Sequence, residues 1–212
     1  MNSNIIRKRR TWAIHLTTLL PGVLLLGDWL SGNLSVNPIQ EAIQRSGRIA
    51  ITLLLVTLAI RPLAQWLKRN WLLNHRRTLG LYTFAYALLH ATLFFGIDYA
   101  LQAALILQEF AAKPYLWLGV GAFCILLPLA ITSFRYWMRK LGKNWKRLHR
   151  LIYLAAVLAV LHYGLAVKGD FFALRGEILR PWLYGAGVAG LLGIRLFGYL
   201  RNQRKRFPRQ PA

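Results

Sequence analysis

Two of the five histidines in this 212-residue chain lie deep inside long apolar stretches, where a polar side chain is costly and usually functional. His90 follows Arg77 by 13 residues, and His162 follows Arg150 by 12. In helices that begin at the same membrane surface, the two imidazoles would lie about 20 and 18 Å deep. A neutral imidazole offers one ring nitrogen to iron while an acceptor holds its other N–H. The pair is therefore predicted to bind a heme from both faces.

Two other roles for these histidines stay open. A buried histidine also serves as a polar contact between packed helices, or as a member of a proton relay in a transporter. A proton pathway is expected to include Asp or Glu in the middle of a span, and no acidic residue is central here. The matched depth of two imidazoles favours heme.

A third histidine, His149, precedes His162 by 13 residues, which places it about 20 Å nearer the basic end of the same helix. This spacing suggests a second heme. Thirteen residues of an ideal helix turn about 140° short of four full turns, so the second site would need its own geometry. His149 also lies in the basic segment KRLHRL, and a role as an interfacial residue stays open.

A second heme would need a partner on the helix that carries His90. One candidate is His75, 15 residues before His90. The other is Arg76, which precedes His90 by 14 residues and lies about 40° from its face of the helix. An arginine pairs with heme propionates or lipid phosphates more often than it binds iron. We expect His75 to be an interface residue and His15 to be a polar contact between helices.

These residues must be positioned by membrane helices. The chain is 56% hydrophobic and 16% charged, with a mean hydropathy of +0.38, and no loop between its apolar stretches has room for a soluble catalytic domain. No internal repeat stands out. The sequence predicts an all-α integral membrane protein, a six-helix bundle formed as one domain over residues 1–212. Its expected spans are residues 12–30, 49–67, 79–101, 115–134, 148–167 and 178–200. The first span is too long for a signal peptide and has no cleavage motif, so we expect it to be retained.

The charges predict the orientation of this bundle. Of 28 basic residues, 21 lie in the N-terminal segment, residues 61–78, residues 135–150 and the tail from Arg201, whereas all six acidic residues lie at or near the opposite loops. Positive loops stay in the cytoplasm, so both termini are predicted to be cytoplasmic. The net charge of +22 therefore indicates topology and contact of the tail with anionic lipid, not a nucleic-acid partner. The single cysteine, Cys124, excludes a cysteine-held metal cluster.

Three segments carry a family resemblance: HRRTLGLYTFAYALLH, LAITS and LGKNWKRLH, together with the HY pair at residues 162–163. With their surroundings, over about residues 46–168, they resemble the MsrQ family, the heme-binding membrane subunits of bacterial protein-methionine-sulfoxide reductase systems. That family belongs to the ferric-reductase-like transmembrane proteins, which also include the NADPH oxidases.

The resemblance implies a non-catalytic electron-transfer subunit in a bacterial inner membrane, with one or two b-type hemes. It assigns heme ligation to His90, His149 and His162, and the family's arginine pair falls on Arg76 and Arg77. It also implies a periplasmic molybdopterin subunit that reduces methionine sulfoxide in oxidised envelope proteins. FMN is implied by the resemblance alone, since no flavin motif is found. A cytoplasmic flavin reductase or a membrane quinol would have to supply the electrons.

Two rival interpretations come from other classes of protein. A small transporter would be expected to show broken mid-membrane helices and internal pseudosymmetry. A structural membrane anchor would explain packed helices but would give His90 and His162 no role.

Overall fold

The computed structural model describes residues 3–167, 169–170, 175–176 and 178–206. Lys168 and Glu177 of the predicted charge pattern, and residues 207–212 of the tail predicted to contact lipid, lie outside the described residues. The longer helices are α1 (Ser3–Leu30), α2 (Pro38–Trp66), α3 (Arg76–Thr92), α5 (Tyr115–Ile131), α8 (Ile152–Ala166) and α9 (Leu179–Arg206).

Shorter elements connect these helices. They are the 3₁₀ segments η1 (Asn70–His75) and η3 (His149–Leu151), the π-helical segment η2 (Leu93–Asp98), and the short helices α4 (Ala103–Ala112), α6 (Arg135–Leu141) and α7 (Lys143–Leu148). Two-residue strands β1 (Gly169–Asp170) and β2 (Arg175–Gly176) pair in antiparallel fashion ahead of α9.

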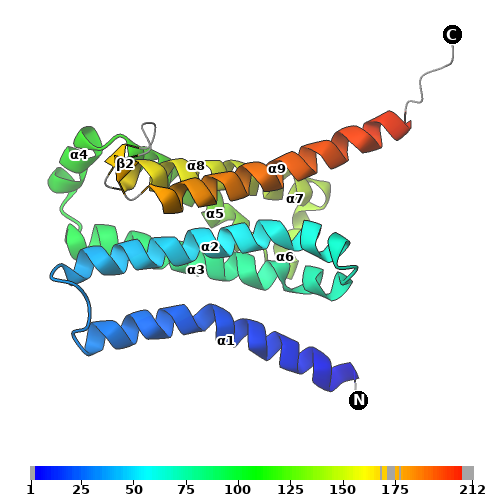
Figure 1. The fold of residues 1–212 in the computed structure, drawn as a ribbon, viewed down its shortest axis with the longest axis horizontal. Coiled ribbons are helices and arrows are strands. Elements are labelled where there is room, and N and C mark those ends of the chain that lie inside the picture. Colours follow the sequence, from blue (N-terminus) through cyan, green and yellow to red (C-terminus); the bar gives the residue numbers. More distant parts are fainter. Residues whose placement is uncertain (1–2, 168, 171–174, 177, 207–212) are drawn as a thin grey trace, which may run out of the picture.

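The predicted all-α membrane fold is confirmed. Five helical segments among the described residues are long and apolar enough to cross a membrane. A sixth crossing arises if α4 and α5, which meet at a bend of 114°, form one broken span. The start of α1 and the end of α9 lie at the same end of the bundle (Figure 1). The sequence did not predict α4, which falls in an expected loop.

Local sequence sets several helix ends. Asn37 caps α2 by accepting a hydrogen bond from the backbone N–H of Gln40, at 3.1 Å, and Pro38 follows at the first helical position. Between α6 and α7 the chain turns at Gly142, whose φ of +49° is a conformation that glycine adopts without strain. That turn leads directly through α7 into His149.

Two helical hairpins, α2 with α3 and α5 with α8, form the centre of the bundle, and α9 packs against α2 and α8. The main core joins α2, α5, α8 and α9 through Ile51, Leu54, Leu58, Leu126, Ala155, Ala156, Val160 and Val188. The two alanines of α8 are fully buried and allow close approach of the neighbouring helices. Helix α1 lies at one edge of the bundle (Figure 1) and buries little of its surface.

Candidate functional site

The imidazoles of His90 on α3 and His162 on α8 lie next to one another between the two hairpins. Their ring centroids are 6.2 Å apart and their planes meet at 78°. A metal–imidazole bond of about 2.0 Å plus roughly 1.1 Å from nitrogen to ring centre, taken on both sides of an iron, gives about 6 Å between centroids. The separation therefore fits two axial ligands of one heme.

Hydrogen bonds fix the tautomer of both rings. Nδ1 of His90 is 2.8 Å from the backbone oxygen of Ile43 on α2, and Nδ1 of His162 is 3.0 Å from that of Tyr115 on α5. A carbonyl oxygen only accepts, so Nδ1 must carry the hydrogen in each ring. Nε2 is left with a free lone pair, the state in which a histidine binds a metal.

A glycine faces each of these rings. A Cβ added at Gly47 would lie 3.0 Å from Nδ1 of His90, and one added at Gly119 would lie 2.8 Å from Nδ1 and Cε1 of His162. Any larger residue would push the ring away from the carbonyl that holds it. These glycines therefore allow both histidines to reach their positions.

The two hairpins hold their histidines by the same arrangement at a constant offset of 72 residues. Ile43, Gly47 and His90 correspond to Tyr115, Gly119 and His162. Sequence inspection missed this internal repeat because most other positions differ between the two halves. The signal was present in the equal spacing of 43 residues from glycine to histidine.

His149 has a comparable environment at the basic end of the bundle. Its Nδ1 is 3.1 Å from the backbone oxygen of Trp145, and its ring stacks on the Trp145 indole with 4.0 Å between centroids. Trp145 is itself held by a 2.9 Å hydrogen bond from its Nε1 to the backbone oxygen of Thr132. Nε2 of His149 is buried without a hydrogen-bond partner in the described part of the chain.

Arginines surround this third histidine. Arg76, at the start of α3, is half-buried and near enough to His149 for its charge to act on the ring. Arg195 of α9 points into the bundle, donates to the Tyr153 hydroxyl and, at 2.9 Å, to the backbone oxygen of Leu58, and its Nε is buried without a partner among the described residues. The charges of Arg61 and Arg76 both act on Arg195. Arg195 was not among the site residues predicted from the sequence.

The two remaining histidines lie elsewhere. Nδ1 of His15 on α1 is 2.7 Å from the hydroxyl of Tyr82 on α3, as expected of a polar contact between helices. His75 lies in η1, beside Trp71 and α1. Within the described ranges, no group of three or more His, Cys, Asp or Glu side chains is arranged to hold a metal ion by itself.

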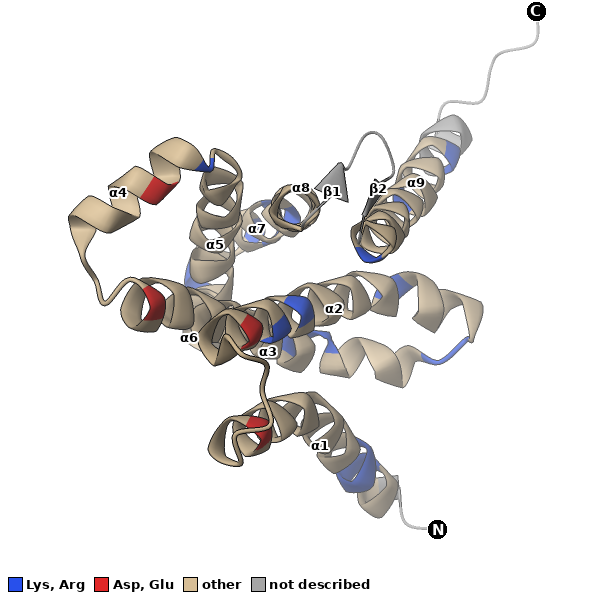
Figure 2. Cartoon of the chain, turned by 60° about the vertical axis from the view of Figure 1, so that its left-hand side comes forward, with Lys and Arg blue, Asp and Glu red and all other residues tan. Residues whose placement is uncertain are grey.

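Acidic residues mark the opposite end of the molecule. Figure 2, in which this end comes forward, shows acidic positions on α1, α2 and α4. Arg45 pairs with Asp28 and Glu41, and Lys113 pairs with Glu109. Burial raises the pKa of Tyr99 above its ordinary value, and the nearby Glu109 carboxylate raises it further.

Comparison with known proteins matches residues 46–160 to the family of the ferric reductase like transmembrane component. This range includes His90 and His149 and ends two residues before His162. The chain is also 42% identical to the protein-methionine-sulfoxide reductase heme-binding subunit MsrQ of Xanthomonas campestris pv. campestris (strain B100), over 91% of this chain and 88% of that protein. MsrQ of Xanthomonas axonopodis pv. citri (strain 306) is 41% identical over 87% of this chain and 84% of its own length. No solved structure matches the chain.

Proposed function

Because this chain belongs to the MsrQ family of heme-binding subunits, within the ferric-reductase-like transmembrane proteins, we propose that it carries electrons across a bacterial inner membrane to a methionine sulfoxide reductase. The chain itself would not be the catalytic subunit. When bound, heme b supplies a reversible one-electron centre at its iron. The observation that carries the proposal is the facing pair of imidazoles, 6.2 Å apart, with both Nε2 atoms left as metal acceptors.

The residues of the repeat would hold the first heme. His90 and His162 supply Nε2, while the carbonyls of Ile43 and Tyr115 orient the rings and fix Nδ1 as the nitrogen that carries the hydrogen. Each ring is held from a different hairpin, so the site depends on the packing of both halves of the bundle.

A second heme would lie at the basic end, with His149 as ligand through its unpartnered Nε2. Arg76 and Arg195 would then receive its propionates, since half-buried guanidinium groups that pair with no described carboxylate favour an anionic group. This arrangement gives Arg76 an electrostatic role and not one as iron ligand.

The charge distribution supports an orientation in which both termini and the basic loops face the cytoplasm. Electrons would then come from a cytoplasmic flavin reductase or from membrane quinol. At the acidic, periplasmic end they would pass to a molybdopterin subunit that repairs oxidised envelope proteins. Binding of FMN rests on family resemblance alone.

A visible absorption spectrum of the purified full-length protein tests this function, because low-spin heme b has a redox-sensitive spectrum. The first heme, between His90 and His162, is called the outward heme because it lies nearer the acidic end. His90→Ala and His162→Ala should each abolish this outward heme, since each removes one of its two histidine ligands. His149→Ala should alter only a second heme. His15→Ala, which removes an imidazole outside the site, is the matched control and should retain the spectrum. Undiminished low-spin heme in His90→Ala or His162→Ala would contradict the assignment.

The internal repeat is also a feature that a transporter would show. Here, however, its equivalent positions converge on two histidines whose Nδ1 atoms are held by backbone oxygens. A proton relay needs rings that release and accept protons at both nitrogens, whereas these rings are each fixed in one tautomer. The repeat therefore favours a ligand clamp.

A further inference from the structure

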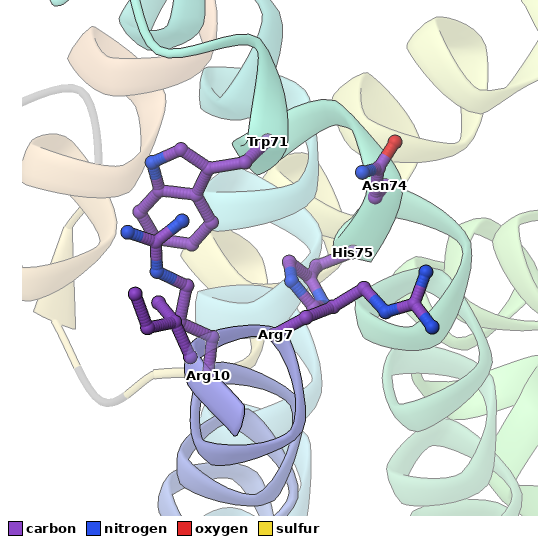
Figure 3. A pocket seen from close by; sticks show the side chains of 6 residues that line it. Arg7, Arg10, Trp71, Asn74 and His75 are labelled. Carbon is purple, nitrogen blue, oxygen red and sulfur yellow. The ribbon is translucent and has the colours of Figure 1, made fainter. Parts of the chain in front are cut away.

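A pocket of about 290 Å³ lies at the basic end of the molecule, between the first turns of α1 and the 3₁₀ segment η1 (Figure 3). It is lined by Ile6, Arg7, Arg10, Trp71, Asn74 and His75. None of these residues has a part in the proposed heme sites. Drug-sized ligands occupy pockets of about 300–1,000 Å³, so this volume suits a compact polar group.

The lining includes two arginines, and no carboxylate in the described part of the chain pairs with either of them. Arg7 and Arg10 extend from α1 on either side of His75 (Figure 3). Among the described residues, carboxylates pair only with Arg45 and Lys113, at the other end of the bundle. Two guanidinium groups beside one space repel each other, and an anion bound between them would relieve that repulsion.

Trp71 positions two of the lining side chains, those of Arg10 and His75. The guanidinium carbon of Arg10 lies 4.5 Å from the Trp71 ring centroid, and the His75 ring meets the same indole edge to face at 5.9 Å. Stacking over an indole leaves the N–H edge of a guanidinium group free to bind a planar or tetrahedral oxyanion. Asn74 adds a neutral side-chain amide at the rim (Figure 3).

The surroundings of the pocket indicate where its anion comes from. Tryptophan is enriched at the level of lipid headgroups, and Trp71 lies at the end of a candidate span. Apolar side chains next to the lining residues are exposed, Ile5 to 47% and Leu73 to 43%. A free phosphate would gain nothing from them, whereas a phospholipid would place its acyl chains there.

We propose that this pocket binds the phosphodiester group of an anionic phospholipid. The two arginines bind the phosphate oxygens, and the lipid links α1 to η1. This contact matters for α1 because that helix lies at the edge of the bundle and buries little surface against the rest of the protein. The site is independent of the heme-binding residues.

Binding and thermal unfolding of the full-length protein test the proposal, in detergent supplemented with phosphatidylglycerol or with phosphatidylcholine. Phosphatidylglycerol should raise the unfolding temperature of the wild-type protein more than phosphatidylcholine does, and native mass spectrometry should show retained phosphatidylglycerol. In Arg7→Gln/Arg10→Gln, affinity for phosphatidylglycerol should fall at least about tenfold, because two charge-assisted contacts are lost.

The matched control is Lys8→Gln/Arg9→Gln, which removes the same charge from the same turns but from residues outside the pocket. It should keep the wild-type response. An equal loss in both double variants would show diffuse surface attraction and overturn the site. Equal stabilisation by inorganic phosphate, with displacement of the lipid response, would overturn the assignment to a phospholipid. Heme absorbance, recorded in parallel, should not change in either variant.

Discussion

At the scale of single residues, the candidate heme site depends on backbone groups as much as on its histidines. Sequence reasoning found His90 and His162 from their depth alone. It could not find the carbonyls of Ile43 and Tyr115, because every residue has a carbonyl and only the packed helices show which ones face a ring. The facing glycines were equally hidden among the 17 glycines of the chain.

We expect Gly119→Ala to weaken the outward heme site. The new methyl carbon would lie 2.8 Å from the His162 ring, so the ring must move away from the Tyr115 carbonyl. Overpacking of this kind costs about 1–3 kcal/mol, which corresponds to about a 5- to 140-fold loss of heme affinity. Titration of heme into the purified apoprotein measures this loss of affinity.

Gly121→Ala is the control on the same helix, because its new methyl would make an ordinary 3.5 Å contact with Leu158. Heme affinity should be unchanged in that variant. If both alanine variants bind heme like the wild-type protein, Gly119 does not define the ring position.

At the scale of helices and turns, the structure changes the geometry expected for His149. The 3₁₀ segment η3 starts at this residue and turns faster than an α-helix. With three residues at the 3₁₀ twist, His149 falls about 80° short of the face of His162, compared with about 140° on an ideal helix. Hydropathy predicted the spans, but such a local tightening has no clear sequence signal.

Helix α9 contributes Arg195, and we expect this residue to tune the second heme site. A positive charge favours the reduced state of a nearby redox centre, and Arg195 shares its surroundings with Arg76, next to His149. Arg195→Gln should therefore lower the midpoint potential of that site by tens of mV, since about 59 mV corresponds to 1.4 kcal/mol for one electron. A spectroscopic redox titration measures the change.

Arg195→Lys keeps the positive charge, so its midpoint potential should be close to that of the wild-type protein. If Arg195 acts only through its hydrogen bonds to Tyr153 and Leu58, the lysine variant should show the same lowered potential as Arg195→Gln. The outward heme provides an internal reference within the same titration. A wild-type midpoint potential in Arg195→Gln would show that the charge of Arg195 does not affect the second heme site.

At the scale of the whole molecule, the charges separate the two ends of the bundle. The acidic positions cluster at one end, and basic loops dominate the other (Figure 2). This asymmetry and the all-α fold were evident from the sequence. The internal repeat was not evident from the sequence. The two halves share three equivalent positions and the direction of their helices, but few other residues are identical.

The basic segment from α6 to η3 includes His149 and is the expected docking surface for a soluble donor. Lys143→Glu/Lys146→Glu should slow reduction of the heme by a flavin reductase, because opposed charges steer an acidic donor toward this loop. The defect should shrink at high salt, since the Debye length is about 8 Å at physiological ionic strength. Stopped-flow absorbance measures the rate, and the static spectrum should not change.

Lys8→Glu/Arg9→Glu carries the same charge reversal at the start of α1 and serves as the control. If both variants are reduced at the wild-type rate at low salt while quinol analogues reduce the heme quickly, the donor is in the membrane. The loop would then determine topology only.

The angle of 78° between the His90 and His162 rings has a consequence for the electronic state of a ferric iron held between them. Each imidazole interacts most strongly with the iron d orbital perpendicular to its own plane. When the two planes are nearly perpendicular, the two orbitals are affected about equally and stay close in energy. Orbital angular momentum is then retained, and the electron paramagnetic resonance signal should show one very large g value. A rhombic signal typical of parallel rings would mean that heme binding rotates one of these imidazoles.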